Sequence, residues 1–204
     1  FTGKMTDIAA NEEVNGTFTW DTPAVKLNAG SHNAKWTFTP DKSYGGKYTT
    51  NTGTATVTVN PKAVTVSGIT ANDKVYDGTT NAVLDYSNAQ FDGILENDKL
   101  TVAAKGMFEK AEAGKQNVAI SDLTLGGDSA ANYVLAESGN QTETTATITA
   151  KEVTVTPDNK SKVYEEKDPK LTYIVSGVLS GETLKGITLA RAEGENAGEY
   201  DITA

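Results

Sequence analysis

The sequence contains no cysteine, one histidine and only five prolines. Without cysteine the fold has no disulfides, so its stability must come from packing, although this absence alone does not fix a cellular compartment. With a single histidine, no Ser-His-Asp or Cys-His set can be assembled around a second candidate base. We therefore expect a protein that is not an enzyme and that carries no cofactor.

Long apolar runs are also missing. No run reaches the roughly 18 apolar residues of a membrane helix, and no charged-then-apolar leader opens the chain. We expect no membrane insertion in this segment. The first residue is Phe1 rather than methionine, so we expect a part of something longer, with any signal peptide or anchor outside it.

The chain has fewer basic than acidic residues, and this imbalance limits the kinds of partner that it can bind. The formal net charge is −9 and the pI is about 4.7. Nucleic acids and anionic membrane surfaces are polyanions, so both are excluded as expected partners. The 30 threonines and 19 glycines instead favour extended strands joined by turns, because β-branched residues lose little when held extended. We expect little helix.

A pattern recurs along the chain at one fixed interval. The motif Ala-Gly-x-x-Asn/Asp occupies residues 29–33, 113–117 and 197–201, and each copy begins 84 residues after the last. The sequence TATVTV at 54–59 returns as TATITA at 145–150. A fixed period is typical of a repeat array, in which function is collective rather than confined to one pocket.

Three modules follow from this period. They are residues 1–61, which lack their first strands, a complete module at 62–150, and residues 151–204, which lack their last strands. AVTV at 63–66 returns as EVTV at 152–155, so the second and third modules open with the same strand. The connections between modules are too short to act as flexible coils, and we expect a rod.

The middle module predicts the fold class. Alternation and turn residues indicate short strands at 63–69, 82–87, 99–109, 116–125, 132–136 and 143–150. This number of strands in about 90 residues predicts a small antiparallel β-sandwich of immunoglobulin type, so the chain is all-β with tandem modules. Residues 91–98 are compatible with one helical turn. A longer helix there would favour a β-grasp-like module instead.

Several motifs carry a family resemblance. KVYDGTT at residues 74–80 resembles the YDG-type repeats of large secreted bacterial surface proteins, which are adhesin-like. The third module is similar to MBG-type repeats through KVY at 162–164, DPKLTY at 168–173 and residues 194–200. MBG-type repeats place glycine directly after Val-Tyr, whereas here Glu165 follows. The resemblance implies an extracellular, stalk-like or adhesive role and brings no catalytic or ligand residues.

Few residues invite a chemical interpretation. His32 occupies a repeat slot that holds Gln116 and Tyr200 in the other modules, which favours a variable turn position over a metal or catalytic site. Loops at 96–98 and 122–128 are rich in oxygen ligands but lack calcium-binding spacing, so solvated carboxylates are favoured there. Trp20 and Trp36 share strand faces with other apolar residues and are expected in the core. An internal isopeptide bond needs a buried Lys, Asn and acid, and no such trio is identified.

The sequence therefore predicts a structural or adhesive segment of a repetitive bacterial cell-surface protein, acting as spacer or stalk. A glycan- or mucin-binding module is the alternative. We expect an extracellular location, partners among unknown extracellular proteins or glycans, and no catalytic, metal or cofactor residues. The incomplete end modules also predict open sheet edges, through which copies of the chain can self-associate.

Overall fold

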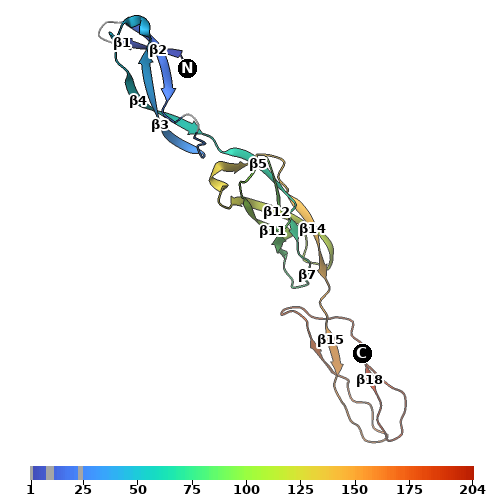
Figure 1. The fold of residues 1–204 in the computed structure, drawn as a ribbon. Helices are drawn as coiled ribbons and strands as arrows, with labels where there is room; N and C mark the ends of the chain where they lie inside the picture. Colours follow the sequence, from blue (N-terminus) through green and yellow to red (C-terminus); the bar gives the residue numbers. More distant parts are fainter. Residues whose placement is uncertain (1, 8–11, 23–24) are drawn as a thin grey trace. The chain divides into compact units, whose positions relative to one another are not determined.

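The computed structural model describes residues 2–7, 12–22 and 25–204, and these residues are mainly β-strand (Figure 1). Their helical content is two 3-10 turns, η1 (Lys42–Tyr44) and η2 (Ala130–Asn132). The helical turn considered at 91–98 is not formed, because the segment begins within strand β10 (Gln90–Asp92) and continues as irregular turns. The all-β prediction with small sandwich-like modules is confirmed, and no described element supplies the helix of a β-grasp fold.

The contacts divide the chain into two compact units, each assembled from separate stretches of sequence. Unit 1 comprises Phe1–Gly68, Ala89–Ala103 and Leu123–Gln141. Unit 2 comprises Ile69–Asn88, Ala104–Asp122 and Thr142–Ala204. Each unit therefore combines one end of the chain with part of its middle.

Unit 1 begins with a four-stranded antiparallel meander, visible in blue and cyan in Figure 1. Its strands are β1 (Thr2–Asp7), β2 (Glu12–Trp20), β3 (Gly30–Pro40) and β4 (Asn51–Val59). The register places Trp20 opposite Trp36 and Phe18 opposite Phe38. The period-two alternation predicted from the sequence therefore brings these aromatic residues to one face of one sheet.

A second sheet of unit 1 has the order β10-β5-β13. β5 (Lys62–Ser67) pairs antiparallel with β10 and parallel with β13 (Tyr133–Leu135). Val64 and Val66 of β5 are almost completely buried, with 1% and 0% exposure. They alternate with the more exposed Ala63 and Thr65, so only one face of β5 faces the interior.

Unit 2 holds most of a five-stranded sheet of order β7-β14-β12-β11-β8. β11 (Thr101–Phe108) and β12 (Gly114–Gly126) begin or end in unit 1, whereas β7 (Lys74–Val75), β8 (Asn81–Ala82) and β14 (Glu143–Thr149) lie wholly in unit 2. β14 pairs antiparallel with β12 and parallel with β7. The buried apolar residues of unit 2 are Ile69, Leu84, Phe108, Val118, Ile120, Ala146 and Ile148.

Three further two-stranded pairings complete unit 2. They join β6 (Thr70–Ala71) to β9 (Leu84–Asp85), β15 (Thr154–Pro157) to β16 (Tyr173–Ser176), and β17 (Ala190–Arg191) to β18 (Ile202–Thr203). All three pairings are antiparallel. The third module is therefore a set of short ladders linked by long irregular segments.

Glu165 stands where MBG-type repeats have glycine after Val-Tyr, and its backbone conformation is unusual. Glu165 has a φ of 67°, in the left-handed region where glycine is favoured. In the middle module the left-handed residue lies one position later, since Gly78, four residues after Lys74, has a φ of 75°, whereas Glu165 is three residues after Lys162. The turn of the third module thus keeps the conformation that glycine would adopt, although its residue has a Cβ atom.

We expect Glu165→Gly to stabilise the chain by about 0.5 to 1 kcal/mol, because glycine removes the steric cost of the left-handed conformation at this exposed position. Urea unfolding measures the change. Glu165→Ala is the matched control, since alanine removes the same carboxylate but keeps the Cβ. Equal stability of the two variants would show that the backbone conformation carries no cost.

Candidate functional site

His32, the only histidine of the chain, lies at the start of β3 and closes a turn. Its Nε2 is 2.7 Å from the backbone carbonyl oxygen of Asn28, four residues earlier. Because a carbonyl oxygen can only accept, the Nε2–H must donate, so His32 serves this turn as a hydrogen-bond donor. No second histidine is available to share a metal.

The residues in the equivalent repeat slots make the same bond. Gln116 donates from Nε2 to the carbonyl oxygen of Glu112 at 2.8 Å, and Tyr200 donates from its hydroxyl to that of Asn196 at 2.8 Å. Each bond spans four residues across the Ala-Gly step. The slot therefore requires a side-chain donor of sufficient length rather than a particular chemistry, and the interpretation of His32 as a variable turn position fits this geometry.

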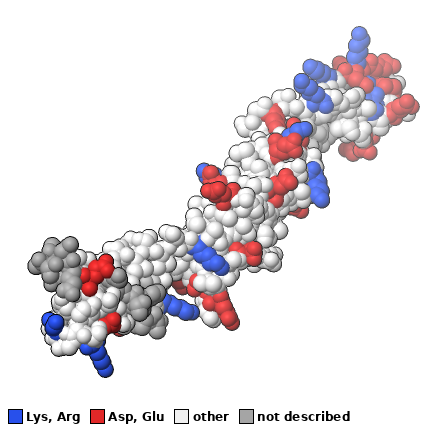
Figure 2. All heavy atoms as spheres, turned by 90° about the horizontal axis from the view of Figure 1, so that it is seen from above, with Lys and Arg blue, Asp and Glu red and all other residues white. Residues whose placement is uncertain are grey.

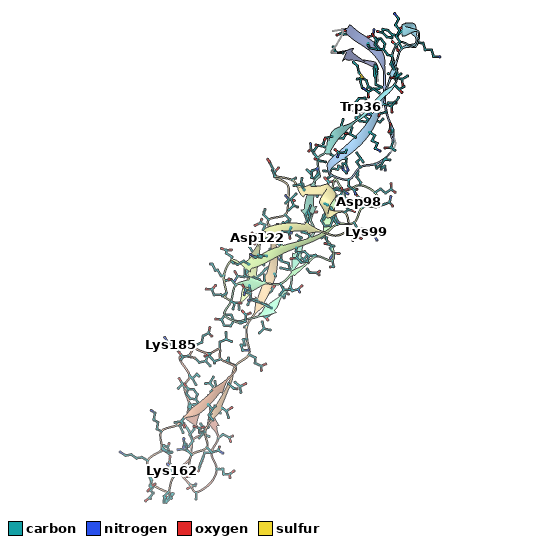
Figure 3. All side chains as sticks on the ribbon, turned by 90° about the vertical axis from the view of Figure 1, so that its left-hand side faces the viewer. Trp36, Asp98, Lys99, Asp122, Lys162 and Lys185 are labelled. Carbon is teal, nitrogen blue, oxygen red and sulfur yellow. The ribbon has the colours of Figure 1, made fainter. Side chains whose placement is uncertain are left out.

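The aromatic residues of β2 and β3 form a partly open face, on which Trp36 is labelled in Figure 3. The Trp36 indole lies directly over Gly53 of β4, where any Cβ atom would overlap the ring. Phe18 meets Trp36 edge to face, with ring centroids 5.4 Å apart and an interplanar angle of 65°. Glycine on β4 thus creates the space in which the indole lies flat on the sheet.

The expectation that both tryptophans belong to the core is only partly correct. Phe38 is 1% exposed, but Trp20 is 37% exposed and Trp36 is half-buried. Together with Phe18, Thr19 and Ala55, the two indoles line an open depression of about 490 Å³. The alternation correctly placed the rings on one face, but it could not show whether a second layer covers that face.

The Val-Tyr-Asp-Gly segment of the middle module is organised around one carboxylate. Asp77 accepts a hydrogen bond from Lys74 Nζ at 2.8 Å, and also from the backbone N–H and the hydroxyl of Thr79 at 2.8 and 2.9 Å. These donors, Lys74 first, lower the pKa of Asp77 to about 2. The aspartate therefore fixes the turn as a charged acceptor.

Two other residues of this segment contact the third module within unit 2. The Tyr76 hydroxyl donates to Glu182 Oε1 at 2.5 Å, and this bond raises the pKa of Tyr76. A Cβ atom at Gly78 would lie 3.3 Å from Leu179. The segment that marks the family resemblance is therefore also a contact point for residues 179–182.

The MBG-like motif residues of the third module form one ionic cluster, with Lys162 labelled in Figure 3. Lys162 Nζ lies 2.8 Å from Asp168 and 2.9 Å from Glu195. Arg191 bridges the same two carboxylates at 3.2 and 2.9 Å and lies over the ring of Tyr200. Two cations and two anions thus compensate one another, and the cluster ties three distant segments together.

This cluster contains a lysine, an aspartate and a glutamate, the groups from which an isopeptide bond could form. Amide formation needs a neutral amine and a protonated carboxyl group. Here the Asp168 carboxylate raises the pKa of Lys162, and Lys162 lowers the pKa values of Asp168 and Glu195. The Asp168 and Glu195 side chains are also 48% and 68% exposed. The geometry therefore favours a salt-bridge network.

The oxygen-rich loops considered for calcium engage protein groups. Asp122 pairs with Lys105 at 2.8 Å, and Asp98 accepts the Tyr133 hydroxyl at 2.5 Å; both aspartates are labelled in Figure 3. In the part of the chain that the structure describes, no three His, Asp or Glu side chains are grouped as they would be around a metal. The described carboxylates therefore provide no assembled metal site.

The distribution of charge bears on possible anionic partners. Figure 2 shows basic and acidic side chains interspersed on the face that it draws, without a broad basic area. Among the described residues, no helix has the length and apolar character needed to cross a membrane.

We expect His32→Gln to leave stability nearly unchanged, because glutamine makes the same bond from position 116. His32→Ala removes the donor and should destabilise unit 1 by about 0.5 to 1.5 kcal/mol in urea unfolding, the usual worth of such a bond. Equal losses in the two variants would mean that the imidazole ring, rather than its donor, is required.

We expect Asp77→Asn to lower the thermal midpoint at neutral pH, because the charged carboxylate stabilises the turn. Since the folded pKa of about 2 lies below the ordinary 3.8, this contribution is present above pH 3.8 and is lost as the pH falls through about 2. The difference between wild type and variant should vanish over that range. Asp128→Asn, in another loop, is the control, and a constant difference down to pH 2 would contradict the assignment.

Comparisons with known proteins agree with these motifs. Residues 60–142 match the YDG domain, and residues 153–204 match the MBG domain of the YGX type. A search of curated proteins and one of solved structures gave no match. The YDG match contains the Asp77 turn, and the MBG match contains the ionic cluster of Lys162 and Arg191. Two separate parts of the chain are therefore similar to these two domain families, residues 60–142 to the YDG domain and residues 153–204 to the MBG domain.

Proposed function

We propose that this chain is a non-catalytic spacer in a repetitive bacterial cell-surface protein, located outside the cell. Its task would be to hold another region of that protein at a distance. The proposal is supported by the tandem YDG and MBG domain matches. Such a function depends on how successive domains are joined.

The junctions between repeats carry the proposal. β4 ends at Val59 and β5 begins at Lys62, while β14 ends at Thr149 and β15 begins at Thr154. Connections of two to four residues are too short for a flexible linker. The compact units also cross these junctions, since unit 1 continues through residue 68 and unit 2 combines part of the YDG match with the whole MBG match.

Side-chain hydrogen bonds also connect the repeats on the two sides of each junction. In unit 1 the backbone N–H of Ala29 donates to Asn132 Oδ1 at 2.8 Å, more than 100 residues away in the sequence. In unit 2 the Tyr76 hydroxyl reaches Glu182 in the MBG match. Contacts of this kind restrict the motion of neighbouring domains. They support a spacer without free hinges.

Glycan or mucin binding remains the alternative. It would use exposed aromatic rings as stacking platforms, and the half-open Trp20–Trp36 depression offers such rings. However, Trp36 and Ala55 of that face are the repeat counterparts of Ile120 and Ala146, which are buried core residues of the middle module. We therefore favour the spacer.

In solution we expect small-angle scattering to give a radius of gyration of about 30 Å, from three modules each about 33 Å long. A compact chain of this length would give about 17 Å, and that value would rule out the spacer. A flexible Gly/Ser insertion between Asn60 and Pro61 is the control. It should raise the high-angle Kratky profile, because it introduces the hinge that the native junction lacks.

A further inference from the structure

The four charged side chains of the cluster in the third module share their partners. Lys162 Nζ and the guanidinium of Arg191 each contact both Asp168 and Glu195, at distances between 2.8 and 3.2 Å. Each of the four carboxylate oxygens takes one of these contacts, because Lys162 meets Asp168 Oδ1 and Glu195 Oε2, whereas Arg191 meets Asp168 Oδ2 and Glu195 Oε1. The two cations therefore share the same pair of anions, and the cluster has no net charge while both carboxyl groups are ionised.

The cations of the cluster are more covered than the anions. The side chains of Lys162 and Arg191 are 22% and 19% exposed, whereas those of Asp168 and Glu195 are 48% and 68% exposed. Arg191 also donates to the carbonyl oxygens of two neighbours in sequence at 2.8 Å, and lies 5.0 Å from the centre of the Tyr200 ring. Solvent protons can therefore reach the carboxylates, but the cations cannot regain full hydration unless their backbone segments move.

The cluster joins two long irregular connections. The connection at 158–172, between β15 and β16, carries Lys162 and Asp168. The connection at 192–201, between β17 and β18, carries Glu195 and directly follows Arg191. β17 and β18 pair over only two residues each. The ionic contacts therefore hold one connection against the other, next to a ladder that is too short to do so firmly.

We propose that this cluster, named here the clasp (Lys162, Asp168, Arg191 and Glu195), is a device that acid opens. Protonation of its two carboxylates leaves two adjacent cations without anions, so the clasp changes from neutral to a charge of +2 and both connections open. The sheet core of unit 2 does not depend on charge, since its apolar residues Phe108, Val118 and Ile148 are at most 1% exposed. Acid therefore opens this part of the third module while the core stays folded.

The pH window follows from the groups that face one another in the clasp. Lys162 first, and then Arg191, lower the pKa values of Asp168 and Glu195. The stability that these carboxylates contribute is present above their ordinary values of 3.8 and 4.5, and is lost as the pH falls through the lowered folded values. Asp168 raises the pKa of Lys162 above the ordinary 10.5, so the lysine contributes fully below that pH. Arg191 stays charged throughout. The clasp is therefore closed at neutral pH and opens on the acid side.

Amide hydrogen exchange followed by NMR, corrected for the intrinsic pH dependence of exchange, tests the proposal. The Ala192 N–H donates to the carbonyl oxygen of Asp201 beside the clasp, and the Ile120 N–H donates to that of Thr142 in the sheet, both at 2.8 Å. As the pH falls from about 6 to about 2.5, Ala192 should lose protection about tenfold or more, while Ile120 keeps its protection. Sodium chloride at about 1 M and neutral pH should also lower the protection of Ala192, because salt screens the ionic contacts.

Variants without charge separate the clasp from the general effect of acid. In the fourfold variant Lys162→Gln, Asp168→Asn, Arg191→Gln and Glu195→Gln, the protection of Ala192 should no longer depend on pH. Glu195→Gln alone leaves two cations with one anion, so it should lower the protection of Ala192 already at neutral pH. The protection of Ile120 verifies in each case that the sheet is folded.

Another lysine–aspartate pair of unit 2 provides the matched control. Lys105 and Asp122 also lie 2.8 Å apart, but their side chains are 79% and 62% exposed. The double variant Lys105→Gln and Asp122→Asn should follow wild type at every pH. The proposal is overturned if Ala192 and Ile120 lose protection together, if Ala192 stays protected down to about pH 2.5, or if the fourfold variant keeps the acid transition.

Discussion

The structure depends on one constraint of extended chains: alternate side chains point to opposite faces, so each sheet collects its apolar residues on one side. That side needs a second layer to leave water, and a single sheet cannot provide one for itself. Val66 and Val118 show the satisfied case, with no measurable exposure. Trp20 and Val153 show sheets with the same alternation whose apolar side stays partly in solvent. Coverage, and not strand formation, is what differs along this chain.

The family motifs differ from the apolar strand residues, because their charged side chains stabilise turns rather than the core. Lys74 precedes Val-Tyr in the YDG domain and pairs with Asp77, and Lys162 precedes Val-Tyr in the MBG domain and pairs with Asp168. In both domains the carboxylate pKa is lowered by its lysine. Such residues recur in repeats because they hold the backbone of a long irregular segment. Their recurrence therefore marks structure and needs no ligand or reaction to explain it.

Much of the fold could be predicted from the sequence, since its strands alternate strictly and repeat. The predicted strands at 63–69 and 143–150 agree with β5 and β14 within two residues. Residues joined by tertiary contacts could not be predicted. The cluster of Lys162, Asp168, Arg191 and Glu195 joins side chains up to 33 residues apart. The division of the chain into modules, with the complete module at 62–150, stays a prediction. The two compact units are defined by tertiary contacts, and a repeat period in the sequence gives no information about those contacts.

The equivalent slots at His32, Gln116 and Tyr200 indicate what this array keeps constant. An imidazole, an amide and a phenol differ in charge, acidity and shape, yet each donates to the carbonyl four residues earlier at 2.7 to 2.8 Å. A catalytic or metal-binding role would depend on the identity of the side chain, because pKa and ligand strength differ among these groups. A role that depends only on backbone geometry tolerates all three. The repeat therefore preserves the course of the chain through each turn, whichever of the three side chains makes the bond.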